Sequence, residues 1–218
     1  NVMHDGNHGA YSNKSWVNKL MGGSIYILAG NVYNWQVQHN VLHHTYTNII
    51  GHDEDLEAGR ILRFSKTAKW YSHHRFQHYY SVFLYGLLTF NWAITTDFLQ
   101  MKRYLKRNLS YGEFKKPAVR WTTLVITKAI YFTIWLVIPM VLGITWWKVI
   151  LGFAVMHYTA GLILSIVFQL AHVVEETTNP IPDENGEIEN TWAIHQLFTT
   201  ANFAPKSWIV NWYTGGLN

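Results

Sequence analysis

Residues 149–171 contain no Asp, Glu, Lys or Arg. A helix that crosses a bilayer needs about 20 consecutive apolar residues, so this stretch predicts a transmembrane helix at about 149–171. A second apolar stretch predicts another at about 121–142, where Lys128 is the one charged residue and Pro139 is expected to kink the helix. Because only a short turn separates the two stretches, the sequence predicts an all-α integral membrane protein built on a transmembrane helical hairpin.

The composition supports a chain that meets lipid. Charged residues make up 14% of the 218 residues, well below the usual quarter, and the chain has 11 Trp and 13 Tyr. Amphipathic aromatic rings of this kind settle at the level of lipid headgroups. The chain has no Cys, which excludes a disulfide framework, Cys-ligated zinc and a Cys-held iron–sulfur cluster in these residues. Length predicts one domain over residues 1–218.

Two histidine boxes are the main chemical signal. The first has His4 and His8 four residues apart, and the second is an H-x-x-x-H-H motif at His39, His43 and His44. Residues four apart share one face of a helix, about 6 Å from each other, so each box can direct imidazole nitrogens into one small space. With 12 His in the chain, chance placement gives H-x-x-x-H about 0.7 times but H-x-x-x-H-H only about 0.04 times. The second box therefore predicts a metal site.

The topology must bring these boxes to one side of the membrane. If 16–37 crossed the bilayer, the two boxes would lie on opposite faces, and if 81–99 crossed it, His172 at the end of the second span would be separated from both. We therefore expect both segments to stay at the interface. The basic run in 102–120 predicts that this side is cytoplasmic.

Imidazole ligands are compatible with iron, zinc or copper. Five His in two boxes exceed the three or four protein ligands of one tetrahedral zinc ion, which favours a centre of two metal ions. The predicted ligands are His4, His8, His39, His43, His44 and His172. We predict no catalytic side chain beyond the metal ligands.

Carboxylates near the boxes are candidates for orienting the ligands, because a carboxylate that accepts the second N–H of an imidazole fixes the ring. We predict this role for Asp5 and Glu176, and His195 is divided between a supporting role at the site and a purely structural one. Asp53 and Asp55 are also candidates, although for Asp55 a helix cap or a solvated acidic turn is the preferred interpretation.

Four further histidines receive other interpretations. His157 precedes His172 by 15 residues, which is about 22 Å along a helix, so we expect a packed, hydrogen-bonded side chain. The group His73, His74 and His78 lies in a basic and aromatic stretch, 60–80. This setting favours an interfacial or headgroup-binding role over metal ligation.

Taken together, the two boxes, the Thr45-Tyr46-Thr47-Asn48 run, and the later Trp192-x-x-His195-Gln196 and Gly215-Gly216-Leu217-Asn218 sequences resemble the membrane fatty acid desaturase family. The similarity covers essentially the whole chain and is greatest to the bacterial linoleoyl-CoA or front-end, delta-6-like, branch.

The resemblance implies a His-ligated di-iron centre of two iron ions on the cytoplasmic face, with O₂ as co-substrate, that desaturates a fatty acyl chain. It also implies an electron donor protein, cytochrome b5-like or ferredoxin, for which the basic run 102–120 is a candidate dock, and no nucleic acid partner. In the family a third box, Gln-x-x-His-His, follows a Gly-Gly-Leu-Asn-like sequence. We therefore expect this chain to be part of a longer protein whose remaining ligands follow Asn218.

Two alternatives remain open at this point. A di-iron lipid or alkane hydroxylase uses similar His boxes and differs in whether oxygen is transferred to carbon. A non-enzymatic membrane protein that binds haem or a metal through His is the other alternative, although the second box lies on a polar stretch rather than within a predicted span.

Overall fold

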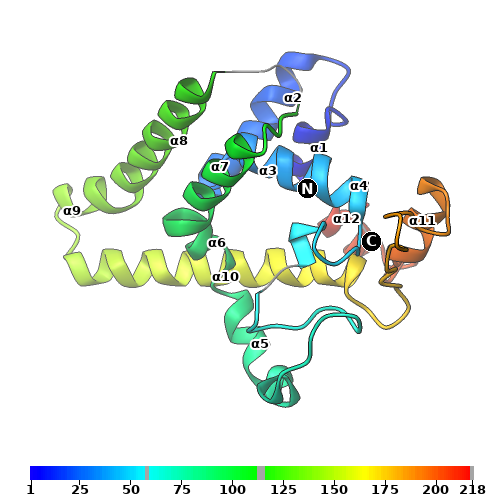
Figure 1. Cartoon of the computed structure of the whole chain (residues 1–218). Coiled ribbons are helices and arrows are strands. Elements are labelled where there is room, and N and C mark those ends of the chain that lie inside the picture. Colours follow the sequence, from blue (N-terminus) through cyan, green and yellow to red (C-terminus); the bar gives the residue numbers. More distant parts are fainter. Residues whose placement is uncertain (57–58, 112–115, 217–218) are drawn as a thin grey trace. The chain divides into compact units, whose positions relative to one another are not determined.

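The computed structural model describes residues 1–56, 59–111 and 116–216, and over these ranges the regular structure is helical (Figure 1). Lys115 of the basic run and Leu217–Asn218 of the closing motif lie outside the described residues. The α-helices are α1 Val2–His8, α2 Ser15–Gly22, α3 Val32–Trp35, α4 His44–Tyr46, α5 Gln77–Tyr85, α6 Leu88–Asn91, α7 Asp97–Lys106, α8 Pro117–Phe132, α9 Ile138–Val141, α10 Trp146–His172, α11 Trp192–Thr199 and α12 Trp208–Thr214. The 3-10 turns are η1 Gly23–Leu28, η3 Glu54–Leu56 and η4 Ser72–Phe76, and the π-helical segments are η2 Gln36–His43, η5 Trp92–Thr96 and η6 Thr133–Val137.

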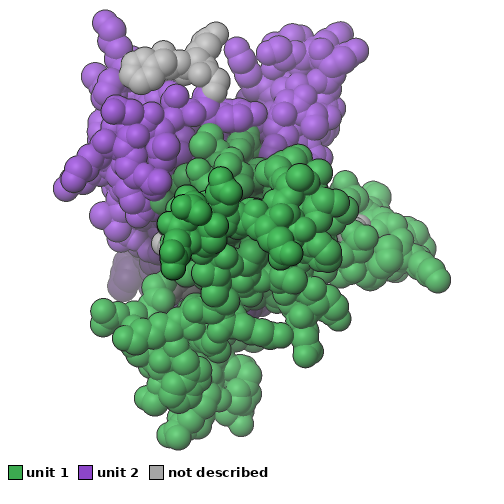
Figure 2. Space-filling view, turned by 45° about the vertical axis from the view of Figure 1, so that its right-hand side comes forward, with its two compact units in different colours: residues 1, 38–82, 166–218 green, residues 2–37, 83–165 purple. Residues whose placement is uncertain are grey.

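The chain forms two compact units, coloured separately in Figure 2. Unit 1 contains residue 1, 38–82 and 166–218, and unit 2 contains 2–37 and 83–165. Box one belongs to unit 2, whereas box two from His39 onward and His172 belong to unit 1.

Among the described residues, two helical stretches are long and apolar enough to cross a membrane, Pro117–Val141 and Trp146–His172. The all-α prediction is thus confirmed, and both stretches begin three or four residues before the expected ones. The pair Ser72–Tyr85 and Leu88–Lys106 would pass the same test as one span bent by 63°. That pair includes 81–99, for which we expected an interfacial position.

Proline shapes the first of these stretches. Pro117 occupies the first turn of α8, where its missing N–H costs no helical hydrogen bond. Pro139 lies just after η6. A proline inside a helix removes one backbone hydrogen bond and crowds the preceding turn, so the expected disturbance takes the form of a π-helical turn.

Unit 2 packs α8 against α10 through an aromatic core. Its buried members are Ala29, Ala93, Tyr131 and Phe153, and the ring centroids of Tyr131 and Phe153 are 6.1 Å apart. Lys128, the charged residue of the first apolar stretch, pairs its Nζ with Asp97 Oδ2 at 2.7 Å and donates to the carbonyls of Trp92 and Ala29. A buried charge is tolerated when it is paired and hydrogen-bonded.

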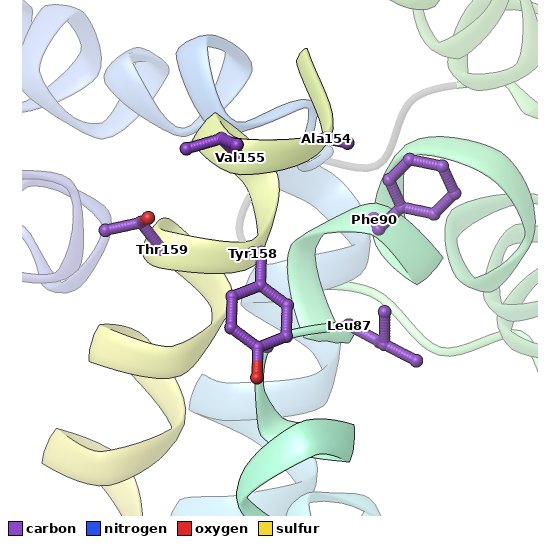
Figure 3. Close-up of a pocket in the computed structure, with 7 residues that line it drawn as sticks. Leu87, Phe90, Ala154, Val155, Tyr158 and Thr159 are labelled. Atoms are coloured by element: carbon purple, nitrogen blue, oxygen red, sulfur yellow. The ribbon is translucent and has the colours of Figure 1, made fainter. Parts of the chain in front are cut away.

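Close helix contact in unit 2 depends on glycine at the break between α5 and α6. A Cβ on Gly86 would lie 2.3 Å from the ring of Tyr158, and one on Gly161 would lie 2.6 Å from the carbonyl oxygen of Gly86. Beside this contact is an apolar pocket of about 380 Å³ (Figure 3). Its lining comes from Gly86, Leu87, Phe90, Ala154, Val155, Tyr158 and Thr159.

Unit 1 ties the end of α10 to α11. The backbone N–H of Ala201 donates to the carbonyl of Ala171 at 2.8 Å, and that of Thr178 donates to the carbonyl of Phe198 at 2.9 Å. These bonds fix both sides of the polar loop between the helices. They also hold the C-terminal end of α10 in place, where His172 lies.

Candidate metal centre

Within box two, His39 and His43 lie in the π-helical segment η2, and His44 follows in the short helix α4. The rings of His39 and His43 stack with centroids 5.0 Å apart and 17° between their planes. His44 opens α4, and its ring centroid is 4.7 Å from that of His39. The three imidazoles therefore form one cluster, and π-helical turns are often found at functional sites.

His43 and His172 face each other through their Nε2 atoms, which are 3.3 Å apart. Nδ1 of His43 is 3.0 Å from Asp53 Oδ2, and Nδ1 of His172 is 3.3 Å from the carbonyl oxygen of Thr199. Since a carboxylate and a carbonyl accept hydrogen bonds, each Nδ1 carries the proton in the neutral ring, and each Nε2 then presents a lone pair. Two lone pairs at this distance repel each other unless a cation or a proton lies between them.

A metal ion fits this arrangement. Two imidazole nitrogens bound to one ion at about 2.1 Å each lie roughly 3.0 to 3.4 Å apart for angles between about 90° and 110°. The 3.3 Å between the Nε2 atoms of His43 and His172 falls in that range. The hydrogen bonds at Nδ1 are also the kind that orient metal-binding imidazoles.

Asp55 occupies the opposite, Nδ1 side of the stacked rings. Its Oδ2 is 3.3 Å from Nδ1 of His39 and 3.6 Å from Nδ1 of His43. His39, His43 and Asp55 offer ligand atoms within 4.8 Å of one another, but the carboxylate already accepts from His39 there. The Nε2 side is therefore the better place for a metal ion.

Burial and these carboxylates set the charge of the cluster. Burial lowers the pKa of His39 to about 3, against the hydrogen bond to Asp55, so the ring is neutral at pH 7. Burial also lowers the pKa of His43, but the hydrogen bond to Asp53 and the charges of both aspartates outweigh it and raise the pKa overall. Burial by itself raises the pKa of Asp55. The hydrogen bond from His39 and the neighbouring histidine charges outweigh burial and hold this pKa below the usual range. Metal ions need deprotonated ligands, which His39 provides.

Asn48 connects the parts of the cluster. It is fully buried with a φ of 63°, a left-handed conformation that Asn tolerates better than most residues. Its Nδ2 donates to the carbonyls of His172, Thr178 and Thr199 at 3.1, 3.1 and 3.2 Å. Its backbone N–H donates to Asp53 Oδ2 at 2.9 Å. The side chain of Asn48 thus holds the segment that follows box two against the C-terminal end of α10.

Helix α11 covers the end of box two. Trp192 Nε1 donates to the carbonyl of His44 at 2.9 Å, and Thr47 Oγ1 donates to Gln196 Oε1 at 3.1 Å. His195 on the same helix is 2% exposed, and its Nε2 is buried without a hydrogen-bond partner among the described residues. These contacts bring His195 into unit 1 beside box two, and its supporting role stays a prediction.

Box one is built separately, in unit 2. The rings of His4 and His8 are 4.4 Å apart, and Trp35 lies edge-on to both, with centroid distances of 5.8 Å. Nδ1 of His4 is 2.9 Å from Asp5 Oδ1, and the role of Asp5 as an orienting carboxylate stays a prediction. A metal centre shared by the two boxes stays a prediction, because they belong to different units.

The orientation of α1 depends on its contact with α2. A Cβ on Gly6 would lie 2.4 Å from the backbone nitrogen of Gly22, and one on Gly22 would lie 2.8 Å from Asn7 Oδ1. Asn7 Nδ2 donates to the carbonyl of Gly22 at 3.0 Å. The two glycines let the helices touch at the level of box one.

Two expectations for the carboxylates need correction. The partner of His172 Nδ1 is the Thr199 carbonyl, not Glu176, because the backbone after α11 returns to the end of α10. Asp55 is not a solvated turn residue: its side chain is 10% exposed and it contacts both histidines of the stacked pair. The acidic run that begins at Asp53, nine residues after His44, was the available signal for Asp53 and Asp55. No local pattern indicated Thr199.

Comparison with known proteins gives one consistent result. The family model described as fatty acid desaturase matches residues 1–218. The chain is 38% identical over 222 residues to an sn-1 linoleoyl-lipid 6-desaturase of Arthrospira platensis, covering 100% of this chain and 58% of that protein. It is 35% identical to an sn-1 linoleoyl-lipid 6-desaturase of Synechocystis, covering 100% and 60%, and 34% identical to an acyl-lipid (8-3)-desaturase of Mortierella alpina, covering 100% and 49%.

No solved structure matches the chain. The chain spans less than two thirds of the length of these curated relatives. The match over its whole length agrees with the histidine boxes and the two apolar helices, and the chain belongs to the fatty acid desaturase family.

Proposed function

We propose that the protein containing this chain introduces a double bond into a fatty acyl chain. Two hydrogens leave adjacent carbons, and O₂ is reduced to two waters with two protons and two electrons from outside. The chain has no Cys, and the described residues indicate no redox centre apart from the His clusters. The electrons therefore come from a partner protein.

The observation that carries this proposal is the pair of Nε2 atoms of His43 and His172, 3.3 Å apart with both Nδ1 atoms hydrogen-bonded. Iron would be held by these two residues together with His39 and His44, and by His4 and His8 of box one. Two bound irons supply the oxidant that an unactivated C–H bond requires.

The surrounding residues do the work of orientation. Asp53 accepts the Nδ1 proton of His43, Asp55 accepts that of His39, and the Thr199 carbonyl accepts that of His172. In each neutral ring the proton then lies on Nδ1, and Nε2 is directed away from the carboxylate or carbonyl that accepts it. Asn48 holds the Thr199 and His172 carbonyls at fixed separation.

The substrate class follows from the relatives. Those named above are called lipid desaturases, linoleoyl-lipid or acyl-lipid, so we favour an acyl group carried on a membrane lipid over acyl-CoA. Candidate spans on α8 and α10 suit an enzyme that takes its substrate from the bilayer. The centre is proposed to lie on the cytoplasmic face, with the basic residues of 102–120 facing the electron donor, a cytochrome b5-like protein or a ferredoxin.

Expression of the complete protein in a host with known fatty acids, followed by gas chromatography and mass spectrometry, tests the reaction. New double bonds support the proposal, and hydroxy acids would assign the chain to the hydroxylase alternative. The variant His43→Ala should lower product at least about 100-fold at equal protein level, since it removes a ligand and not only its support. A haem absorption band in the purified protein would contradict a non-haem iron centre.

A further inference from the structure

Segment 59–82 of unit 1 carries a second cluster of polar side chains, separate in the sequence from the histidine boxes. Between Gly59 and Thr96 the chain has five cationic residues and no Asp or Glu. The cationic residues are Arg60, Arg63, Lys66, Lys69 and Arg75. Exposed aromatic rings stand among them, with Trp70, Phe76 and Tyr79 at 56, 48 and 77% exposure.

The loop before η4 is held in a defined shape. Gln77 bonds Arg63 twice, accepting from its backbone N–H at 2.7 Å and donating to its carbonyl at 3.0 Å. Tyr80 donates its hydroxyl to the carbonyl of Ile61 at 2.8 Å. His74 accepts from the backbone N–H of Tyr71 through Nδ1, and its Nε2 bonds the carbonyl of Arg60 at 3.0 Å. The cluster is thus a built surface rather than a set of unrelated side chains.

This segment forms an open, polar surface pocket of about 370 Å³. The lining residues are Arg63, Trp70, His74, Gln77, His78 and Ser81. Arg63 uses two of the five N–H donors of its guanidinium on the carbonyls of Ala68 and Lys66. Arg75 stacks on Phe76 at 4.6 Å from the ring centroid. A pocket that contains a guanidinium and an indole, in a segment with several cations and no Asp or Glu, suits an anion attached to an apolar body.

The position of the pocket along the chain indicates the kind of anion that it binds. From His78 the helix α5 runs on into apolar side chains, with Val82 and Phe83 more than half exposed. The bent pair that contains α5 is apolar enough to enter a membrane. Cations and amphipathic rings at the polar end of such a helix lie at headgroup depth.

We propose that the pocket formed by Arg63, Trp70 and His78, with the flanking Lys66, Lys69 and Arg75, binds the phosphate of an anionic phospholipid headgroup. Free phosphate offers the same charge without the acyl chains that would contact the apolar turn of α5. An acidic protein is the other class of ligand that a cationic surface attracts, but the exposed apolar side chains of Val82 and Phe83 at the end of α5 favour a lipid. The inference concerns lipid binding and does not depend on the reaction at the histidine boxes.

The test uses the complete protein purified in a non-ionic detergent and titrated by microscale thermophoresis. The probes are dihexanoyl phosphatidylglycerol, dihexanoyl phosphatidylcholine and inorganic phosphate. We expect phosphatidylglycerol to bind at least about tenfold more tightly than each of the other two.

Replacement of three exposed cations with Gln, in the variant Lys66→Gln, Lys69→Gln, Arg75→Gln, should weaken phosphatidylglycerol binding at least about tenfold, given the effect of each cation near an anionic surface. The control removes the same charge elsewhere, at the exposed Lys14, Lys19 and Lys206, and should change the affinity less than about threefold. Thermal unfolding of both variants checks that they are folded.

Equal affinity for the two lipids, or equal losses in the two triple variants, would overturn the proposal. Phosphate binding as tight as that of phosphatidylglycerol would also overturn it and assign the pocket to a free anion.

Discussion

His157 and His172 lie on the same helix, α10, but their imidazole rings have different partners. The comparison distinguishes a buried structural histidine from a candidate metal ligand. In unit 2, Nδ1 of His157 is 3.0 Å from Thr89 Oγ1 and Nε2 is 2.8 Å from the hydroxyl of Tyr131. Thr89 gives its own proton to the carbonyl of His157 at 2.9 Å, so its oxygen accepts from Nδ1 and Nε2 accepts from Tyr131. Every polar atom of that imidazole has a complementary partner.

His172 in unit 1 differs at one atom. Its Nδ1 is hydrogen-bonded to a carbonyl like a structural histidine, but its Nε2 meets the Nε2 of His43. The closed network needs nothing further, whereas the open pair needs a metal ion or a proton between its two nitrogens.

The largest effect on stability is expected from the closed network of unit 2. The variant Lys128→Met leaves Asp97 buried and unpaired, which should lower the free energy of unfolding by about 3–5 kcal/mol. Adding Asp97→Asn removes the stranded charge and should recover a large part of the loss. Thermal unfolding in detergent measures both, and an unchanged midpoint for Lys128→Met would show that the pair is not buried in the membrane-embedded protein.

In the histidine cluster of unit 1, replacing a residue that orients a ligand is expected to change metal binding more than stability. The variant Asp53→Asn removes the carboxylate that fixes the tautomer of His43 and should weaken iron binding about 10- to 100-fold. Iron retention after dialysis against a ferrous chelator measures the change. Retention equal to that of the unmodified protein would count against Asp53 as an orienting group.

Asn48 should be sensitive to loss of its donor alone. The variant Asn48→Asp keeps the shape and the tolerance for a positive φ, but turns an N–H donor that faces three carbonyls into an acceptor. We expect about 2 kcal/mol of destabilisation together with loss of iron. Asn108→Asp is the matched control, since Asn108 also has a positive φ of 52° but is exposed, and it should change stability by less than about 0.5 kcal/mol.

The sequence predicted much of the fold because membrane-spanning helices and histidine boxes are local signals. Residues 149–171 and 121–142 predict helices through their apolar composition, which Lys128 alone interrupts with a charge. The spacing of His39, His43 and His44 predicts the histidine cluster. The bend at Gly86 was not predicted, since it depends on the ring of Tyr158 more than 70 positions later in the chain. The role of the Thr199 carbonyl was not predicted either, because a backbone oxygen has no sequence signature.

The spacing of the histidines predicted the wrong local helix type for box two. The His39–His43 separation was expected on an α-helical turn, but the residues lie in π-helical η2 and their rings stack. His157 shows the opposite case, because its distance along α10 from His172 correctly predicted a packed, hydrogen-bonded residue.

A smaller effect is expected at box one, whose geometry depends on the packing of α1 against α2. The variant Gly22→Ala places a Cβ 2.8 Å from Asn7 Oδ1 and should cost about 1–2 kcal/mol of stability. Gly152→Ala is the control, since a Cβ there meets nothing within 4 Å, and it should be neutral or slightly stabilising. Equal effects of the two substitutions would contradict the close contact between α1 and α2.

Iron content tests most directly whether the open pair of unit 1, His43 and His172, is a metal site. Iron per molecule is measured by inductively coupled plasma mass spectrometry in the purified complete protein carrying His172→Gln or His157→Gln, after both are shown to be folded. We predict that His172→Gln loses at least half of its iron while His157→Gln keeps the content of the unmodified protein. Equal iron content in the two variants would contradict the assignment of His172 as a ligand.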